Sequence, residues 1–151
     1  MDPNFVPEKA VRLAEAGRHS EALAIFERNI ISSLSPKDQS IYAFSLAAVE
    51  EDYERAVGMC IRAAEKEFYN PEIYLNLGRV LLLSGKKIRA LKAFKKGLRF
   101  DESHMALKQE ILRLGQRRTP AISFLPRGNV INKVFGLLSY KVGGQGLALM
   151  A

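Results

Sequence analysis

The chain has 151 residues, a net charge of +7, 48% hydrophobic and 26% charged residues, a single cysteine and no tryptophan. A chain of this size and composition can bury the core of one globular domain, and a single cysteine excludes an internal disulfide. The charge is unevenly divided, because residues 1–78 carry 8 Lys/Arg and 13 Asp/Glu whereas residues 79–151 carry 15 and 3. The basic second part indicates an acidic partner, a phosphate backbone or a membrane surface, or else a solvated face.

The start of the sequence and its hydropathy indicate a compartment. Met1 is followed by Asp2 and Pro3 rather than by basic residues and an apolar stretch, so we expect no signal peptide. No segment has the roughly 20 continuous apolar residues that a membrane-spanning helix needs. The lone Cys60 suits a reducing environment. We therefore expect a cytoplasmic protein.

Several residue types recur with a period of 34 residues. The recurring positions are Ala22, Ala56 and Ala90; Phe26, Cys60 and Phe94; Gly17, Glu51 and Gly85; and Ala10, Phe44 and Gly78. A fixed period of this length is typical of stacked structural repeats, each a small unit that buries its apolar face against the next. The sequence therefore predicts three repeats, at about residues 3–35, 36–69 and 70–102.

Each repeat is predicted to hold two helices. A capping residue and a proline open the first helix of each repeat, at residues 2–3, 35–36 and 70–71. A tight turn at Gly17, Glu51 or Gly85 ends it, and apolar residues at helical spacing continue into the second helix. Small residues such as Gly78 let two helices approach closely, and an aromatic residue such as Phe94 fills the adjoining space.

The segment 74–81, followed by Ala90 and Phe94, resembles the tetratricopeptide repeat. The resemblance covers residues 3–102 and implies an all-α, right-handed superhelix of helix pairs, with a groove lined by the first helix of each pair. The second repeat departs from the pattern, with Phe44 in place of a small residue and Cys60 in place of phenylalanine. We expect these two exchanges to compensate each other in volume.

Residues 102–151 follow the repeats. Residues 102–114 are expected to form a capping helix that covers the last repeat, so that the repeat domain spans residues 1–115. Residues 116–128 are expected to be an extended linker, and residues 129–151 an amphipathic helix with a flexible end. The apolar residues of this tail are Ile122, Phe124, Leu125, Val130, Ile131, Val134, Phe135 and Leu138.

A short apolar helix needs a surface to cover it, and three remain open for the tail. It could pack on the end of the repeat domain, occupy a groove in its own or a neighbouring copy, or bind a membrane or partner. Exchange between copies would make the protein a homo-oligomer.

The repeat register also predicts the residues that face the groove. They are Val11, Ile41, Ser45, Val49, Leu75, Asn76, Arg79, Leu82 and Leu83. This set is mostly apolar and suits a peptide or an amphipathic helix, although Leu82 and Leu83 could also simply pack between helices. We therefore expect a scaffold that binds another polypeptide.

A strongly basic segment occupies the second helix of the third repeat. Its residues are Lys86, Lys87, Arg89, Lys92, Lys95, Lys96 and Arg99. An acidic protein surface is favoured as its partner over nucleic acid, since neither interleaved aromatic residues nor a recognition motif accompanies it. A membrane adaptor is the other alternative. Since no metal-binding cluster or nucleophilic pair stands out, we expect neither a cofactor nor catalysis.

Overall fold

A computed structural model describes residues 5–28 and 33–115, and these residues form helices with no strand among them. The elements are α1 (Phe5–Glu15), α2 (His19–Glu27), α3 (Pro36–Glu50), α4 (Tyr53–Lys66), α5 (Pro71–Leu83), α6 (Lys87–Leu98) and α7 (Met105–Gly115). The predicted all-α class is confirmed for this part of the chain. The linker and tail predicted for 116–151 lie outside the described residues, as does the cap predicted at Asp2 and Pro3.

Polar side chains fix where the helices begin. The Ser35 hydroxyl accepts the backbone N–H of Asp38 at 3.1 Å, and the Asn70 side chain accepts that of Glu72 at 3.1 Å. Helices α3 and α5 therefore begin at Pro36 and Pro71, as predicted. The Asp52 carboxylate caps α4 in the same way, because a side-chain oxygen satisfies one of the unpaired N–H groups at the helix start.

The first helix of each pair ends at the same repeat position. Gly17, Glu51 and Gly85 all have a positive φ, of 78°, 58° and 76°. This left-handed backbone reverses the chain within a few residues, so that the next helix can return alongside the first. The predicted turns are therefore confirmed. Glu51 is the exception among them, since a side chain disfavours this conformation.

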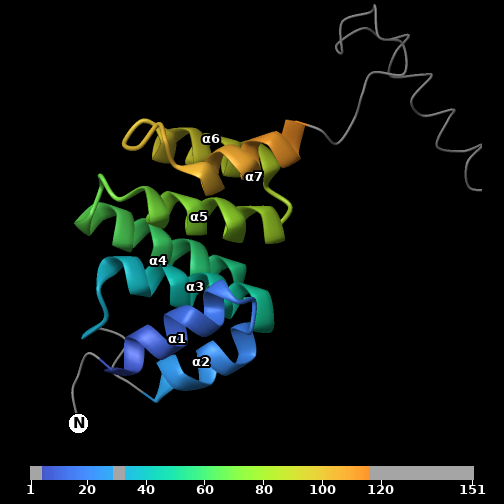
Figure 1. Ribbon diagram of the computed structural model, residues 1–151. Coiled ribbons are helices and arrows are strands. Elements are labelled where there is room, and N and C mark those ends of the chain that lie inside the picture. The colour runs from blue at the N-terminus through green and yellow to red at the C-terminus, as the bar shows by residue number, and fades with distance from the viewer. Residues whose placement is uncertain (1–4, 29–32, 116–151) are drawn as a thin grey trace, which may run out of the picture. The chain divides into compact units, whose positions relative to one another are not determined.

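Helices α1 to α6 pack consecutively against each other in chain order (Figure 1). Helices α1 and α2, α3 and α4, and α5 and α6 form the most extensive contacts, and α1, α3 and α5 also contact one another in sequence. The core between these layers combines aliphatic, small and aromatic residues. Gly78 of α5 lies directly against the buried ring of Phe94 on α6. A side chain at residue 78 would therefore overlap with the ring.

In the second repeat, Phe44 and Cys60 stand at the positions of Gly78 and Phe94. Cys60 is fully buried, with its sulfur 3.9 Å from the carbonyl oxygen of Ser40, and burial raises the pKa of its thiol to about 12. Phe44 is only partly buried, and its ring lies against the side chains of His19 and Arg79. The compensation in volume between Phe44 and Cys60 stays a prediction.

The capping helix is shorter at its start than predicted. Helix α7 begins at Met105 rather than residue 102, because a turn precedes it in which the Asp101 carboxylate accepts two hydrogen bonds from Ser103. His104 then caps α7, since its Nδ1 accepts the N–H of Leu107 at 3.3 Å. Gly115 is the last residue of the helix, one position beyond the predicted end.

Replacing Gly78 with alanine tests the close approach of α5 and α6. The new methyl group overlaps with Phe94, so we expect Gly78→Ala to lower the free energy of unfolding in urea by about 1–3 kcal/mol. The matched control is Gly58→Ala within α4, where the added Cβ lies 3.4 Å from the end of the Arg62 side chain. This control should stabilise the protein by about 0.5–1 kcal/mol. Equal effects of the two substitutions would contradict the steric argument.

The left-handed turn at Glu51 offers a second test of the repeat geometry. We expect Glu51→Gly to raise the free energy of unfolding by up to about 1 kcal/mol, since glycine removes the cost of the positive φ. Glu50→Gly, one residue earlier at the last position of α3, should instead destabilise by up to about 1 kcal/mol. Urea unfolding of both variants measures the difference, and destabilisation by Glu51→Gly would show that its side chain has another role.

Candidate functional site

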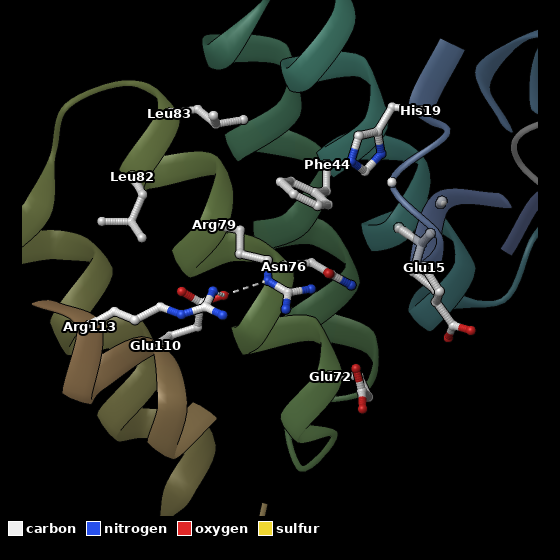
Figure 2. A pocket seen from close by; sticks show the side chains of 13 residues that line it. Glu15, His19, Phe44, Glu72, Asn76, Arg79, Leu82, Leu83, Glu110 and Arg113 are labelled. Atoms are coloured by element: carbon white, nitrogen blue, oxygen red, sulfur yellow. Dashed lines mark hydrogen bonds and ion pairs between the residues drawn. The ribbon is translucent and has the colours of Figure 1, made fainter. Parts of the chain in front are cut away.

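A cavity of about 390 Å³ lies along the first helices of the pairs (Figure 2). Its lining residues come from α1, α3, α5 and α7, together with Gly17 in the turn between α1 and α2 and His19, the first residue of α2. Helix α7 thus takes the place that the first helix of a fourth pair would occupy. We call this cavity the groove.

The structure brings together five of the nine residues predicted to face the groove. Ile41, Asn76, Arg79, Leu82 and Leu83 line it, and Figure 2 shows the last four among its labelled side chains. The last two differ in surroundings. Leu82 is partly buried and packs against the core of α5, α6 and α7, whereas 45% of Leu83 is exposed. Leu82 therefore packs between helices as well as lining the groove, whereas Leu83 lines it with an exposed side chain.

The other four predicted residues lie elsewhere. Ser45 is fully buried, and Leu75 is buried in the core with Phe94. Val11 packs partly buried against the core, and Val49 is exposed without lining the groove. None of these four residues lines the cavity. The reason is helical phase, because adjacent residues differ by about 100° around a helix.

A charged cluster forms the α5–α7 side of the groove. The Arg79 guanidinium donates from Nε to a carboxylate oxygen of Glu110 at 3.0 Å, and Arg113 approaches the same oxygen at 3.9 Å. The side chain of Glu110 is only 10% exposed, so this ion pair is weakly screened by solvent. The cluster ties the capping helix to the third repeat. It also places one partly exposed cation, Arg79, at the groove surface.

Arg79 also reaches across to the second repeat. Its guanidinium carbon lies 5.6 Å from the centre of the Phe44 ring, in cation–π geometry. The His19 ring meets Phe44 edge to face at 4.8 Å, and its Nδ1 lies 3.2 Å from the Ser45 hydroxyl. Burial, and then the positive charge of Arg79, lower the pKa of His19. The groove thus favours a neutral histidine.

Two further polar side chains stand on α5. The Asn76 amide donates to the Ser40 hydroxyl at 2.9 Å, and this hydroxyl donates to the carbonyl of Lys37. Glu72 lies 3.0 Å from Nε2 of His104, the ring that caps α7. Since Nδ1 of that ring accepts a backbone N–H, the proton of a neutral ring is on Nε2 and is donated to Glu72.

Several groove residues lie outside the predicted set. They include His19, Phe44, Glu110 and Arg113. One signal could have identified the last two: α7 follows the third repeat as a first helix would, so its inward face belongs to the same surface. Phe44 was noticed only as a departure from the small residue expected there.

A buried serine lies beside the groove residue His19, but the pair is not arranged for nucleophilic chemistry. Ser45 is fully buried, so a substrate carbonyl has no access to its hydroxyl. The His19 ring faces Phe44 and Arg79, rather than a carboxylate that would orient it. Within residues 5–28 and 33–115, no group of three His, Cys, Asp or Glu side chains could hold a metal ion. The groove offers apolar surface and hydrogen-bond donors.

The seven residues of the predicted basic segment lie on α6 or at its two ends. All seven side chains are exposed, and none forms an ion pair with another described residue. The eight tail residues predicted to bind a surface lie outside the described part of the chain. None of the helices described is long and apolar enough to cross a membrane.

Protonation of His19 should weaken the fold. The pKa of His19 is lower in the folded protein than in the unfolded chain, so the neutral ring stabilises the fold fully above the unfolded-state pKa of about 6.5. This stabilisation is lost as the pH falls from there through the folded-state pKa. We expect the free energy of unfolding to fall between pH 7 and pH 5 more steeply in the natural chain than in His19→Asn. Urea unfolding at each pH measures the difference. An identical pH profile in both proteins would contradict the argument.

A comparison of the sequence with protein-family models gives no match, and a comparison with curated proteins gives no significant relative. The repeat family inferred from the 34-residue period is therefore a proposal. It rests on the recurring turns, caps and contacts of the described helices.

Proposed function

We propose that this chain is a non-catalytic scaffold that binds a polypeptide segment in the groove, on a right-handed tetratricopeptide superhelix of three repeats. Three features support the architecture: the left-handed turns at Gly17, Glu51 and Gly85, the small-against-aromatic contact of Gly78 and Phe94, and the extension of the groove over α1, α3, α5 and α7. Buried Cys60 is compatible with the proposed cytoplasmic location.

The observation that carries the proposal is the mixture of surfaces inside the groove. Ile41, Phe44, Leu82 and Leu83 provide apolar area. Beside them, Arg79 uses its Nε to donate a hydrogen bond to Glu110, its one hydrogen-bond partner among the described residues. The terminal nitrogens of Arg79 carry further N–H groups. Apolar area holds the side chains of a bound segment, and such donors hold its backbone carbonyls. A polypeptide presents both.

The tail of this chain is the first candidate for that segment. Residues 116–151 contain five Lys/Arg and no Asp/Glu, whereas residues 1–78, which supply much of the groove, have 8 Lys/Arg against 13 Asp/Glu. Opposite charge favours their encounter, and the apolar residues around Phe124 and Phe135 match the leucine-lined part of the groove. Binding in the same copy would regulate access to the groove, and binding in a second copy would produce a homo-oligomer.

A binding experiment with the tail as a separate peptide tests the proposal. We expect a fluorescein-labelled peptide of residues 119–141 to bind a chain that ends at Arg118, with saturable fluorescence anisotropy. Leu83→Lys should weaken this binding at least tenfold, because it places a charge in the apolar part of the groove. Lysine is compatible with this position at the C-terminus of α5.

The matched control is Leu112→Lys on α7. This leucine is 60% exposed and does not line the groove, so binding should change by less than about twofold. Light scattering of the full chain and the shortened chain then separates the two modes: a full-length dimer that becomes a monomer on truncation means exchange between copies. Equal binding by both leucine variants, or no saturable binding, would contradict occupation of the groove.

A further inference from the structure

A second cavity of about 430 Å³ lies among α4, α5 and α6, and it shares no lining residue with the groove. Its floor is aliphatic and consists of Val57 and Ile61 from α4, Leu77 and Leu81 from α5, and Ala93 from α6. Ile61 is 41% exposed, so part of this floor is open to solvent. We call this cavity the outer cleft. It is an apolar surface with no described segment covering it.

One edge of the outer cleft is strongly basic. Arg89, Lys92 and Lys96 of α6 line it, and the remaining members of the basic segment lie close by along the same helix. The Lys96 ammonium group sits 5.1 Å from the centre of the Tyr74 ring. The only acidic side chain lining the cleft among the described residues is Glu65. The seven cations on α6 and at its two ends, with no acid among them, repel one another, and a polyanionic partner relieves this repulsion.

Exposed aromatic rings extend the cleft at Tyr74. The ring of Phe100 stacks on Tyr74 at 5.6 Å, and the ring of Phe68 meets Phe100 edge to face at 6.2 Å. Phe68 and Tyr69 are 62% and 61% exposed, although residues of this size are usually covered. An apolar floor that continues into exposed aromatic rings is typical of the centre of a protein–protein interface.

From the aliphatic floor, the basic edge and the aromatic extension we infer that the outer cleft binds an acidic amphipathic helix of a partner protein. The apolar face of such a helix covers Ile61 and its neighbours. Its Asp and Glu side chains lie over Lys92 and Lys96. The inference does not depend on the proposed function of the groove, because the two surfaces have no residue in common.

Charge and chemistry decide against other occupants. The tail of this chain has five Lys/Arg and no Asp/Glu between residues 116 and 151, so the basic edge repels it. A second copy presents acidic residues on helices such as α3, whose large apolar residues Ile41, Tyr42 and Leu46 are already buried in the core. A nucleic-acid duplex would neutralise the lysines, but its bases are stacked inside the helix and leave no apolar face to cover the aliphatic floor.

The test uses the full chain and two designed 20-residue peptides labelled with fluorescein. In the first, leucines at positions i, i+3, i+4 and i+7 form one helix face and glutamates form the other. The second has the same composition in scrambled order. We expect saturable anisotropy with the first peptide, binding at least tenfold weaker with the second, and a loss of affinity when salt rises from 50 to 500 mM.

Three variants locate the binding site. Lys92→Glu and Ile61→Ser should each weaken binding of the first peptide at least tenfold, since both positions line the outer cleft and are exposed. The control is Lys108→Glu on α7, an exposed position outside the cleft, which should change binding less than about twofold. Circular dichroism of each variant at the measuring temperature shows that the helices are intact.

Four results would overturn the inference. Equal binding of the scrambled peptide would show simple charge attraction, and equal loss with Lys108→Glu would show an effect of net charge. Loss with Leu83→Lys but not with Lys92→Glu would place the peptide in the groove. Binding of a 20-base-pair DNA duplex at 150 mM salt more tightly than the first peptide would identify the basic segment as a nucleic-acid surface.

Discussion

Helices in this chain approach each other closely because glycine stands where the neighbouring element requires space. Gly78 accommodates the Phe94 ring and thereby sets the distance between α5 and α6. Gly97 on α6 plays the same part for the capping helix, since a Cβ there would lie 2.7 Å from a methyl carbon of Leu107. The polar geometry of the groove follows from these apolar contacts, because only a closely packed α7 brings Glu110 within 3.0 Å of Arg79.

The charged cluster of Arg79, Glu110 and Arg113 in turn fixes the shape of the groove. A nearly buried carboxylate is costly without partners, and Glu110 has Arg79 and Arg113 on its two sides. The orientation of Arg79 over Phe44 then couples the third repeat to the second, and His19 extends the contact to the start of α2. Residues from three helix pairs and the capping helix thus share one connected set of contacts. A segment bound there would meet a preorganised surface, which lowers the entropic cost of binding.

The sequence allowed the helix starts and turns to be predicted, because each depends on a local signal. Ser35 and Asn70 cap the first turn of the helix that follows each of them. Gly17 and Gly85 tolerate the left-handed conformation independently of contacts with other helices. Side-chain direction is harder to predict. Leu75 and Asn76 are neighbours, yet the first faces the core of α5, α6 and α7 and the second faces the groove. A single-residue error in helical phase exchanges these roles.

Partnerships between distant elements could not be predicted in the same way. The contact between Arg79 and Glu110 spans 31 residues and joins a repeat to a helix that follows the repeats, so the 34-residue period carries no information about it. The outer cleft likewise combines aliphatic residues of α4 with cations of α6. Periodicity described each helix separately, and the chemistry of both surfaces arises where two helices meet.

Cys60 gives the molecule an internal indicator of its own opening. The sulfur is fully buried between α3 and α4, and burial holds the pKa of the thiol at about 12, so the reactive thiolate is scarce at neutral pH while the helices are together. An alkylating reagent reaches this single thiol only in molecules whose second helix pair has separated. The rate of alkylation therefore measures how often the middle of the chain opens, without any engineered label.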